Sequence, residues 1–255
     1  MTCPARWSAG PSNPPRQLPA IMELPSALLT PTEWIALRLS LQVALCSALV
    51  SLPFAIFAGY LLARFQFLGK WLVEVLIDLP LVLPPVVSGY LLLVSFGPHG
   101  PIGSILSGWL GIKIVFTWLG AAMASAVVSF PLMVRAIRLA FQGVDPRFEM
   151  AARGLGAGRL RAFFTVALPL ARRGLVAGFM LAFARSLGEF GATIMVAGNI
   201  EGRTRTIPLA IYTLTNQPDG MGGAWRLVGL SILLACAALV ASEWLERRHS
   251  PDVRA

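Results

Sequence analysis

Five long apolar stretches dominate the pattern of hydrophobic and polar positions along this chain of 255 residues. A helix needs about 20 apolar residues to cross the hydrocarbon core of a bilayer. The stretches run from 39 to 63, from near Trp71 to about Phe96, from 114 to 134, from about Leu175 to Ala197, and from about Arg226 to Trp244. The pattern therefore predicts an all-α polytopic membrane protein with about five transmembrane helices.

The second stretch is interrupted by "DLPLVLPPVVSGY", which includes Pro80, Pro84 and Pro85. Each proline removes a backbone donor and clashes with the carbonyl one turn earlier, and the freed groups need partners in the protein or in a water-filled path. Pro84 and Pro85 thus predict a kinked or broken helix, which either lines a cavity or packs bent within the bundle. Asp78 is expected to bond within the bundle and Glu74 to be solvated. Residues 97–113 predict an external loop with a short interfacial helix.

The fourth stretch carries charge at membrane depth. Arg185 and Glu189 are four residues apart in "FARSLGEFGATIMVAG", so a continuous helix would place them on one face. Ionised groups inside a membrane usually face the bundle interior or an aqueous cavity. Two interpretations stay open: this face, with Ser186, lines a translocation path, or the two charges form a structural ion pair that holds helices together.

Composition supports a membrane protein and orients it. The chain is 56% hydrophobic and 13% charged, with a mean hydropathy of +0.71, which leaves too little polar surface for a soluble fold. The net charge of +9 is better explained by cytoplasmic loops than by nucleic-acid binding, because lysine and arginine gather on the inner side of membrane proteins. An outside amino terminus and an inside carboxyl terminus put most of the basic residues on that side.

The remaining sequence sets the domain boundaries. Residues 1–30 are Pro-rich and polar, without a secretory signal, and predict a flexible tail, so that either Met1 or Met22 fits as the first residue. A permease domain is expected over 31–247 and a cytoplasmic tail over 248–255. Neither a phosphate-binding loop nor a pattern of catalytic or metal-ligating residues is found. No cofactor and no enzymatic activity are therefore expected in this chain.

Between the third and fourth stretches lies "EMAARGLGAGRLRAFFTVALP", residues 149–169, on the predicted inner side. Residues 150–155 predict a short helix stopped by the glycines at 154, 156 and 158. Small side chains allow another surface to come close, which favours a helix inserted into a cleft of a second protein. A partner-free amphipathic interfacial helix is the alternative. Residues 163–174 predict a second short apolar helix, with Pro169 fixing the turn back to the membrane.

This loop resembles the EAA motif of the inner-membrane permease subunits of ABC importers. Aligned on Gly156, the motif matches its two alanines with Ala151 and Ala152 and its later residues with Val166, Leu168 and Pro169. Met150 takes the place of the motif's glutamate, and Glu149 precedes it. Four further segments, "LPLVLPPVVSGYLLLVSFG", "SFPLMVRAIRLAFQGVD", "LAFARSLGEFGATIMVAGNI" and "RTRTIPLAIYTL", are similar to molybdate permeases in particular.

The resemblance implies a function and an assembly. It implies a permease subunit of an ATP-driven importer of molybdate in the bacterial inner membrane. Two permease subunits would form the pathway, with the coupling helix docked in a cytoplasmic ATPase subunit and a periplasmic binding protein delivering the oxyanion. The first alternative is a permease of the same architecture that transports tungstate, sulfate or thiosulfate. A secondary anion transporter or channel is the second, which predicts an internal repeat that the sequence does not display.

Overall fold

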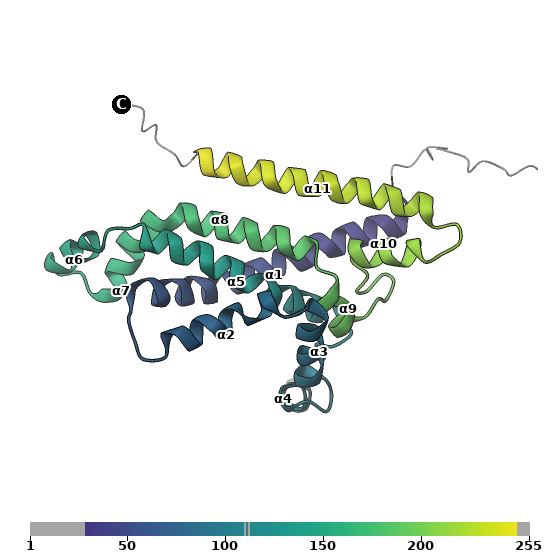
Figure 1. Ribbon diagram of the computed structural model, residues 1–255, viewed down its shortest axis with the longest axis horizontal. Coiled ribbons are helices and arrows are strands. Elements are labelled where there is room, and N and C mark those ends of the chain that lie inside the picture. Colours follow the sequence, from purple (N-terminus) through teal and green to yellow (C-terminus); the bar gives the residue numbers. More distant parts are fainter. Residues whose placement is uncertain (1–28, 110, 112, 249–255) are drawn as a thin grey trace, which may run out of the picture. The chain divides into compact units, whose positions relative to one another are not determined.

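The computed structural model describes residues 29–248 apart from 110 and 112, so residues 1–28 and 249–255 of the two predicted tails lie outside it. All the regular structure in this part of the chain is helical (Figure 1). Four helices are long and apolar enough to span a membrane, and a bent helix pair makes a fifth candidate. The predicted all-helical fold with about five spans is therefore confirmed.

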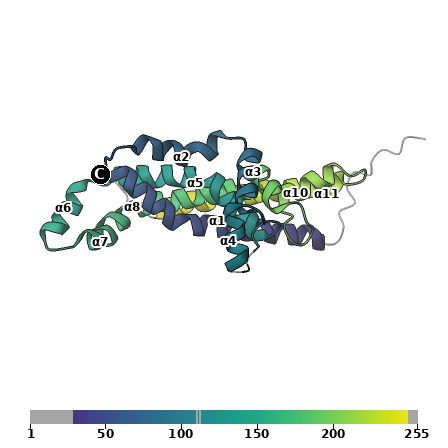
Figure 2. The ribbon, with the colours of Figure 1, turned by 90° about the horizontal axis from the view of Figure 1, so that it is seen from below.

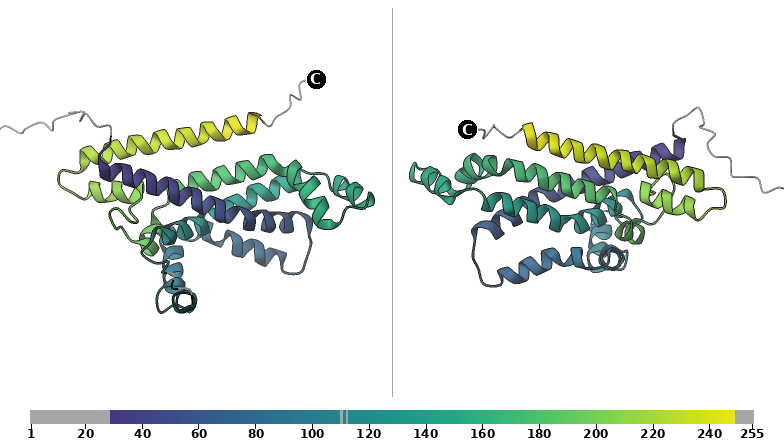
Figure 3. Two further views of the ribbon diagram at one scale, coloured as in Figure 1. Left: turned by 180° about the vertical axis from the view of Figure 1, so that it is seen from behind. Right: turned by 45° about the horizontal axis from the view of Figure 1, so that its top comes forward.

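Three helices form the core: α1 (Pro31–Arg64), α5 (Trp118–Gln142) and α8 (Leu168–Leu187). They lie side by side (Figures 1 and 3). Small residues line their contacts, which is how membrane helices approach closely. A Cβ added to Gly59 of α1 would lie 2.8 Å from Ile137 Cγ2 of α5, and one added to Gly174 of α8 would collide with Ala140.

The outward faces of these helices are apolar and exposed, as lipid contact requires. On α1 the exposed side chains include Leu49, Phe54 and Phe57. The long helix α11 (Met221–Arg248) packs against α8 and α10 (Ile207–Thr215) and leaves most of its surface free. Only 11% of its most apolar 18-residue segment is buried, so α11 has few neighbours within this chain.

The second span is broken at its prolines, as the sequence predicts. The chain bends by 111° between helix α2 (Lys70–Val82) and helix α3 (Pro85–Phe96). Figure 2 shows the two helices running in different directions. Pro84 caps α3 and Pro85 occupies its first turn, where a missing N–H costs nothing. The predicted short helix in the following loop is α4 (Pro101–Trp109).

Two ion pairs tie α2 to α5. Arg135 donates to both carboxylate oxygens of Asp78, at 3.0 and 2.7 Å, which confirms that Asp78 bonds within the bundle. Arg138 Nη2 lies 3.0 Å from Glu74 Oε1. The prediction that Glu74 is simply solvated is therefore wrong, because the next turn of α5 supplies it with a partner.

The fourth span differs from its prediction at both ends. A helical run from Arg159 to Leu187 forms the span; it comprises α7 (Arg159–Ala162), one π-helical turn (Phe163–Ala167) and α8. Pro169 lies in the first turn of α8 and fixes no turn of the chain, because the wider π-helical turn before it accommodates the ring. The span also ends at Leu187, and α9 (Gly191–Ala197) follows as a separate helix.

Candidate coupling surface and translocation path

The predicted docking helix is α6 (Pro146–Gly154), four residues longer at its start than the sequence suggests. Asp145 caps it by accepting a hydrogen bond from the backbone N–H of Arg147 at 2.9 Å, and Pro146 occupies its first turn. Its end is a Schellman turn, in which the N–H of Ala157 donates to the carbonyl of Ala152. Gly156 supplies the left-handed backbone that this turn needs, with φ +90°.

Glu149 fastens α6 to the end of α1. Its Oε1 lies 2.8 Å from Arg64 Nη2, and its Oε2 accepts a hydrogen bond from the Tyr60 hydroxyl at 2.8 Å. Arg64 Nη2 also donates to the carbonyl of Val144 at 2.9 Å, just before α6. The Arg64 and Glu149 side chains are only 12% and 15% exposed, so solvent screens this contact weakly. We call Tyr60, Arg64 and Glu149 the α1–α6 clamp.

Helix α6 thus has two different faces. Glu149 and Arg153, one turn apart, line a cavity against α1. Phe148, Met150 and Leu155 are exposed, Leu155 by 91%. Ala151 is exposed as well, and Ala152 is partly buried. Met150, at the motif's glutamate position, therefore belongs to the free face, whereas Glu149 is used to hold the helix in place.

The later residues of the predicted loop lie elsewhere. Val166 is in the π-helical turn and is partly buried, Leu168 packs against the core cluster, and Pro169 is exposed. These three residues return the chain to the core, and the free face of α6 is formed without them.

The fourth span breaks between its two charges. Arg185 is in the last turn of α8, whereas Glu189 lies beyond the end of that helix. The predicted single helix through both residues is therefore wrong, yet they still pair, with Arg185 Nη1 2.8 Å from Glu189 Oε2. Glu189 also accepts a hydrogen bond from the Ala192 N–H at 2.9 Å, so it caps α9. Its side chain is 2% exposed and that of Arg185 31%, which leaves guanidinium N–H groups accessible.

Ser186 points into the core. Its hydroxyl lies 2.9 Å from Ser47 Oγ of α1, which donates to it, and 3.3 Å from Ser129 Oγ of α5. Three helices are therefore joined at one depth by a chain of hydroxyl groups. Such bonds between membrane helices typically contribute about 0.6 kcal/mol each. Ser186, predicted from the sequence to lie on the face of a translocation path, is thus buried at a contact between three helices.

The two broken spans cross one another. A Cβ on Gly191 of α9 would lie 2.9 Å from Pro85 Cβ, and a Cβ on Gly89 of α3 would lie 2.7 Å from Ala192 Cα. The break at Pro84–Pro85 and the break at Glu189 are thus adjacent in space. The sequence does not reveal this, because the two sites are about a hundred positions apart. Three buried hydroxyls on α3, α5 and α9 have no hydrogen-bond partner within the described part of the chain: those of Ser88, Ser125 and Thr193.

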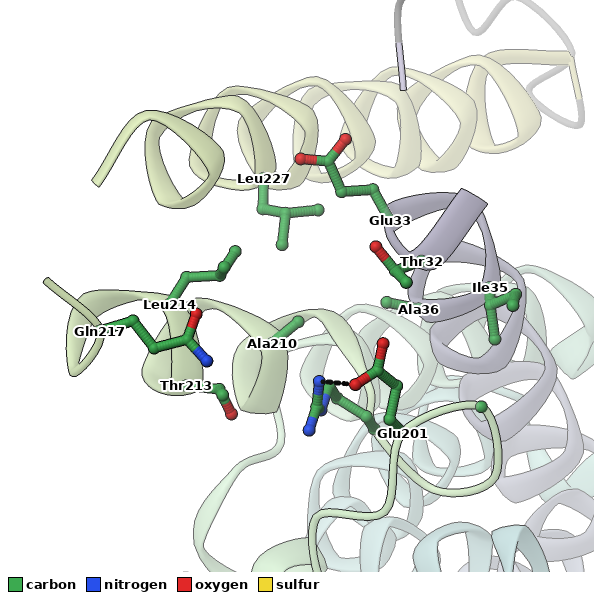
Figure 4. A pocket seen from close by; sticks show the side chains of 12 residues that line it. Thr32, Glu33, Ile35, Ala36, Glu201, Ala210, Thr213, Leu214, Gln217 and Leu227 are labelled. Carbon is green, nitrogen blue, oxygen red and sulfur yellow. Dashed lines mark hydrogen bonds and ion pairs between the residues drawn. The ribbon is translucent and has the colours of Figure 1, made fainter. Parts of the chain in front are cut away.

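The opposite end of the bundle holds a smaller polar cavity of about 260 Å³ between the starts of α1 and α11 and helix α10 (Figure 4). Arg205 bridges to Glu201 at 3.0 Å beside it. Glu33, almost fully buried, pairs with Arg226 at 2.9 Å, which fixes the start of α1 to α11. Sequence reasoning left these partners unassigned.

Comparisons with known proteins agree with this geometry. The model of the family described as "Binding-protein-dependent transport system inner membrane component" matches residues 51–251. The molybdenum transport system permease protein ModB of Escherichia coli is 59% identical over 220 residues, 86% of this chain and 96% of that protein. The sulfate transport system permease protein CysT of Escherichia coli is 38% identical over 184 residues, 72% of this chain and 66% of that one.

A solved structure has the same fold. The crystal structure of a bacterial alginate ABC transporter in complex with an alginate pentasaccharide-bound periplasmic protein superposes with a TM-score of 0.67 at 18% identity, over 86% of this chain and 80% of that chain. Together with the family match over most of the sequence, the helical spans establish what kind of protein this is. The chain belongs to the family of inner membrane components of binding-protein-dependent transport systems.

Proposed function

We propose that this chain is the permease subunit of an ATP-driven molybdate importer. The identity of 59% to a molybdenum permease, over almost the whole of that protein, carries the proposal. Sulfate is the alternative cargo, and the 38% identity to a sulfate permease over a smaller share makes it the weaker one. The partners in this proposal are a cytoplasmic ATPase subunit and a periplasmic molybdate-binding protein.

In this proposal α6 is the coupling helix. Its free face, with Met150, Ala151 and Leu155 exposed, docks in a groove of the ATPase. The α1–α6 clamp on its other face passes the movement of the ATPase to the end of α1. ATP-driven closure of two ATPase subunits then switches the pathway between inward- and outward-facing states by rigid-body motion.

The proposed path runs past the adjacent breaks of the second and fourth spans. Arg185 presents accessible N–H groups there, held by Glu189, and Pro84 and Pro85 open the helix opposite. Exposed guanidinium N–H groups donate charge-assisted hydrogen bonds to an oxyanion. Five spans of one chain are too few to enclose such a path, so two copies of the permease are expected to form it.

The test is reconstitution of this chain with its ATPase and binding-protein subunits in proteoliposomes. Molybdate, tungstate and sulfate are compared at equal concentration for uptake and for stimulated ATP hydrolysis. The proposal expects ATP-dependent uptake of molybdate to exceed that of sulfate. Uptake of sulfate in preference to molybdate would show that sulfate is the transported oxyanion. Uptake without ATP would indicate a secondary transporter.

A further inference from the structure

A large apolar groove lies beside α6, separate from the proposed path. Its volume is about 680 Å³. One wall is α1, with Pro53, Phe57 and Leu61, and the other is the segment entering α8, with Leu160 and Phe164. Several of these large side chains, including Phe57, Leu160 and Phe164, are exposed. An apolar groove of this size is large enough to hold a hydrophobic ligand.

The groove has a cationic mouth. Arg153 of α6 and Arg159 of α7 line it, and neither side chain has an ion-pair partner among the described residues. Glu149 also lines the groove, but Arg64 and Tyr60 already bind its two oxygens. Two free guanidinium groups therefore give the mouth a net positive charge.

The length of the groove matches one leaflet of a bilayer. It follows α1 from Pro53 to the end of the helix and reaches Phe65, the next residue, a length of about 18 Å at 1.5 Å per residue. The hydrocarbon core is about 30 Å thick, so the groove reaches from the arginine-rich interface to about the middle of the membrane. Basic pockets at the cytoplasmic ends of membrane helices bind anionic lipid headgroups.

We propose that this groove binds one anionic phospholipid of the inner leaflet, with its phosphate between Arg153 and Arg159 and an acyl chain along Phe57 and Pro53. The proposal requires the membrane orientation argued above but does not depend on which oxyanion is carried. It also places a lipid directly against the α1–α6 clamp, so that lipid composition would influence how firmly α6 is held.

The test measures lipid retained by the full chain, purified from nanodiscs of equal phosphatidylglycerol and phosphatidylcholine, by native mass spectrometry. We expect retained phosphatidylglycerol in preference to phosphatidylcholine, and a loss of at least about tenfold in the double variant R153Q/R159Q. The control R172Q/R173Q removes two exposed arginines of α8 outside the groove and should retain the lipid. R153K/R159K keeps the charge and should also retain it, which separates loss of charge from misfolding.

Three outcomes would overturn the proposal. The first is equal retention of the two lipids by the unmodified chain. The second is retention by R153Q/R159Q equal to that of R172Q/R173Q. The third is occupation of the groove by a second copy of the chain, which would appear as a covalent dimer when Phe57→Cys, in a background with the native cysteines replaced by serine, is oxidised in the membrane.

Discussion

Replacing Glu149 by glutamine tests the α1–α6 clamp. The substitution keeps the shape of the side chain and an acceptor for Tyr60 but removes the charge that Arg64 contacts at 2.8 Å. Removing one partner of a buried ion pair costs about 3–5 kcal/mol, and the residual exposure of both side chains, 12% and 15%, lowers this cost. We therefore expect Glu149→Gln to reduce the free energy that holds α6 against α1 by about 2–3 kcal/mol.

This loss is measurable as local opening. Amide hydrogens exchange with solvent through such openings, and each 1.36 kcal/mol of lost stability raises the exchange rate by a factor of about ten. Amide exchange in α6 should therefore accelerate about 30- to 150-fold in the absence of nucleotide. The matched control is Glu201→Gln, whose pair with Arg205 is solvent-exposed, with Glu201 57% exposed. Exposed pairs contribute at most about 1 kcal/mol, so exchange near Glu201 should rise less than about fivefold. Equal protection of α6 in Glu149→Gln and the unmodified chain would refute the clamp.

Three further substitutions test the account, and the two glycine substitutions among them each have a matched control. Gly156→Ala should weaken the end of α6 by about 1–2 kcal/mol because the backbone φ of Gly156 is +90°. Its control is Gly154→Ala, which is also in open space and should stabilise the helix by up to about 1 kcal/mol. Equal effects of the two substitutions on thermal unfolding of the complex would contradict this. Gly191→Ala should lower the thermal midpoint and uptake because its Cβ meets α3 at 2.9 Å, while Gly188→Ala meets nothing within 4 Å and should be close to neutral. Arg185→Ala should reduce uptake at least tenfold while ATP hydrolysis persists, and wild-type uptake in an assembled variant would remove Arg185 from the path.

Hydropathy was sufficient to predict about five spans, and the prolines were sufficient to predict the break in the second one. An average over some twenty residues detects an apolar run, and three prolines within six residues leave few alternatives to a break. These features are determined by residues that are near one another in the sequence.

The misassigned features depend on distant residues. Glu74 gains Arg138 as a partner from another helix, and Glu149 is held by a residue 85 positions earlier, Arg64. The break before α9 escaped the hydropathy pattern because the apolar runs before Arg185 and after Glu189 keep the average over some twenty residues high. Pro169 appeared to require a turn, but one π-helical turn accommodates it within a continuous helical run.

The central claim is that α6 transmits ATP-driven motion to a molybdate path. The most direct test measures molybdate uptake and ATP hydrolysis in the same proteoliposomes, holding this chain with its ATPase and binding-protein subunits. Uptake should stop when ATP is omitted, and Gly156→Val should reduce both uptake and molybdate-stimulated hydrolysis in a complex that still assembles. Uptake that continues without ATP, or that proceeds at the wild-type rate in this variant, would contradict the claim.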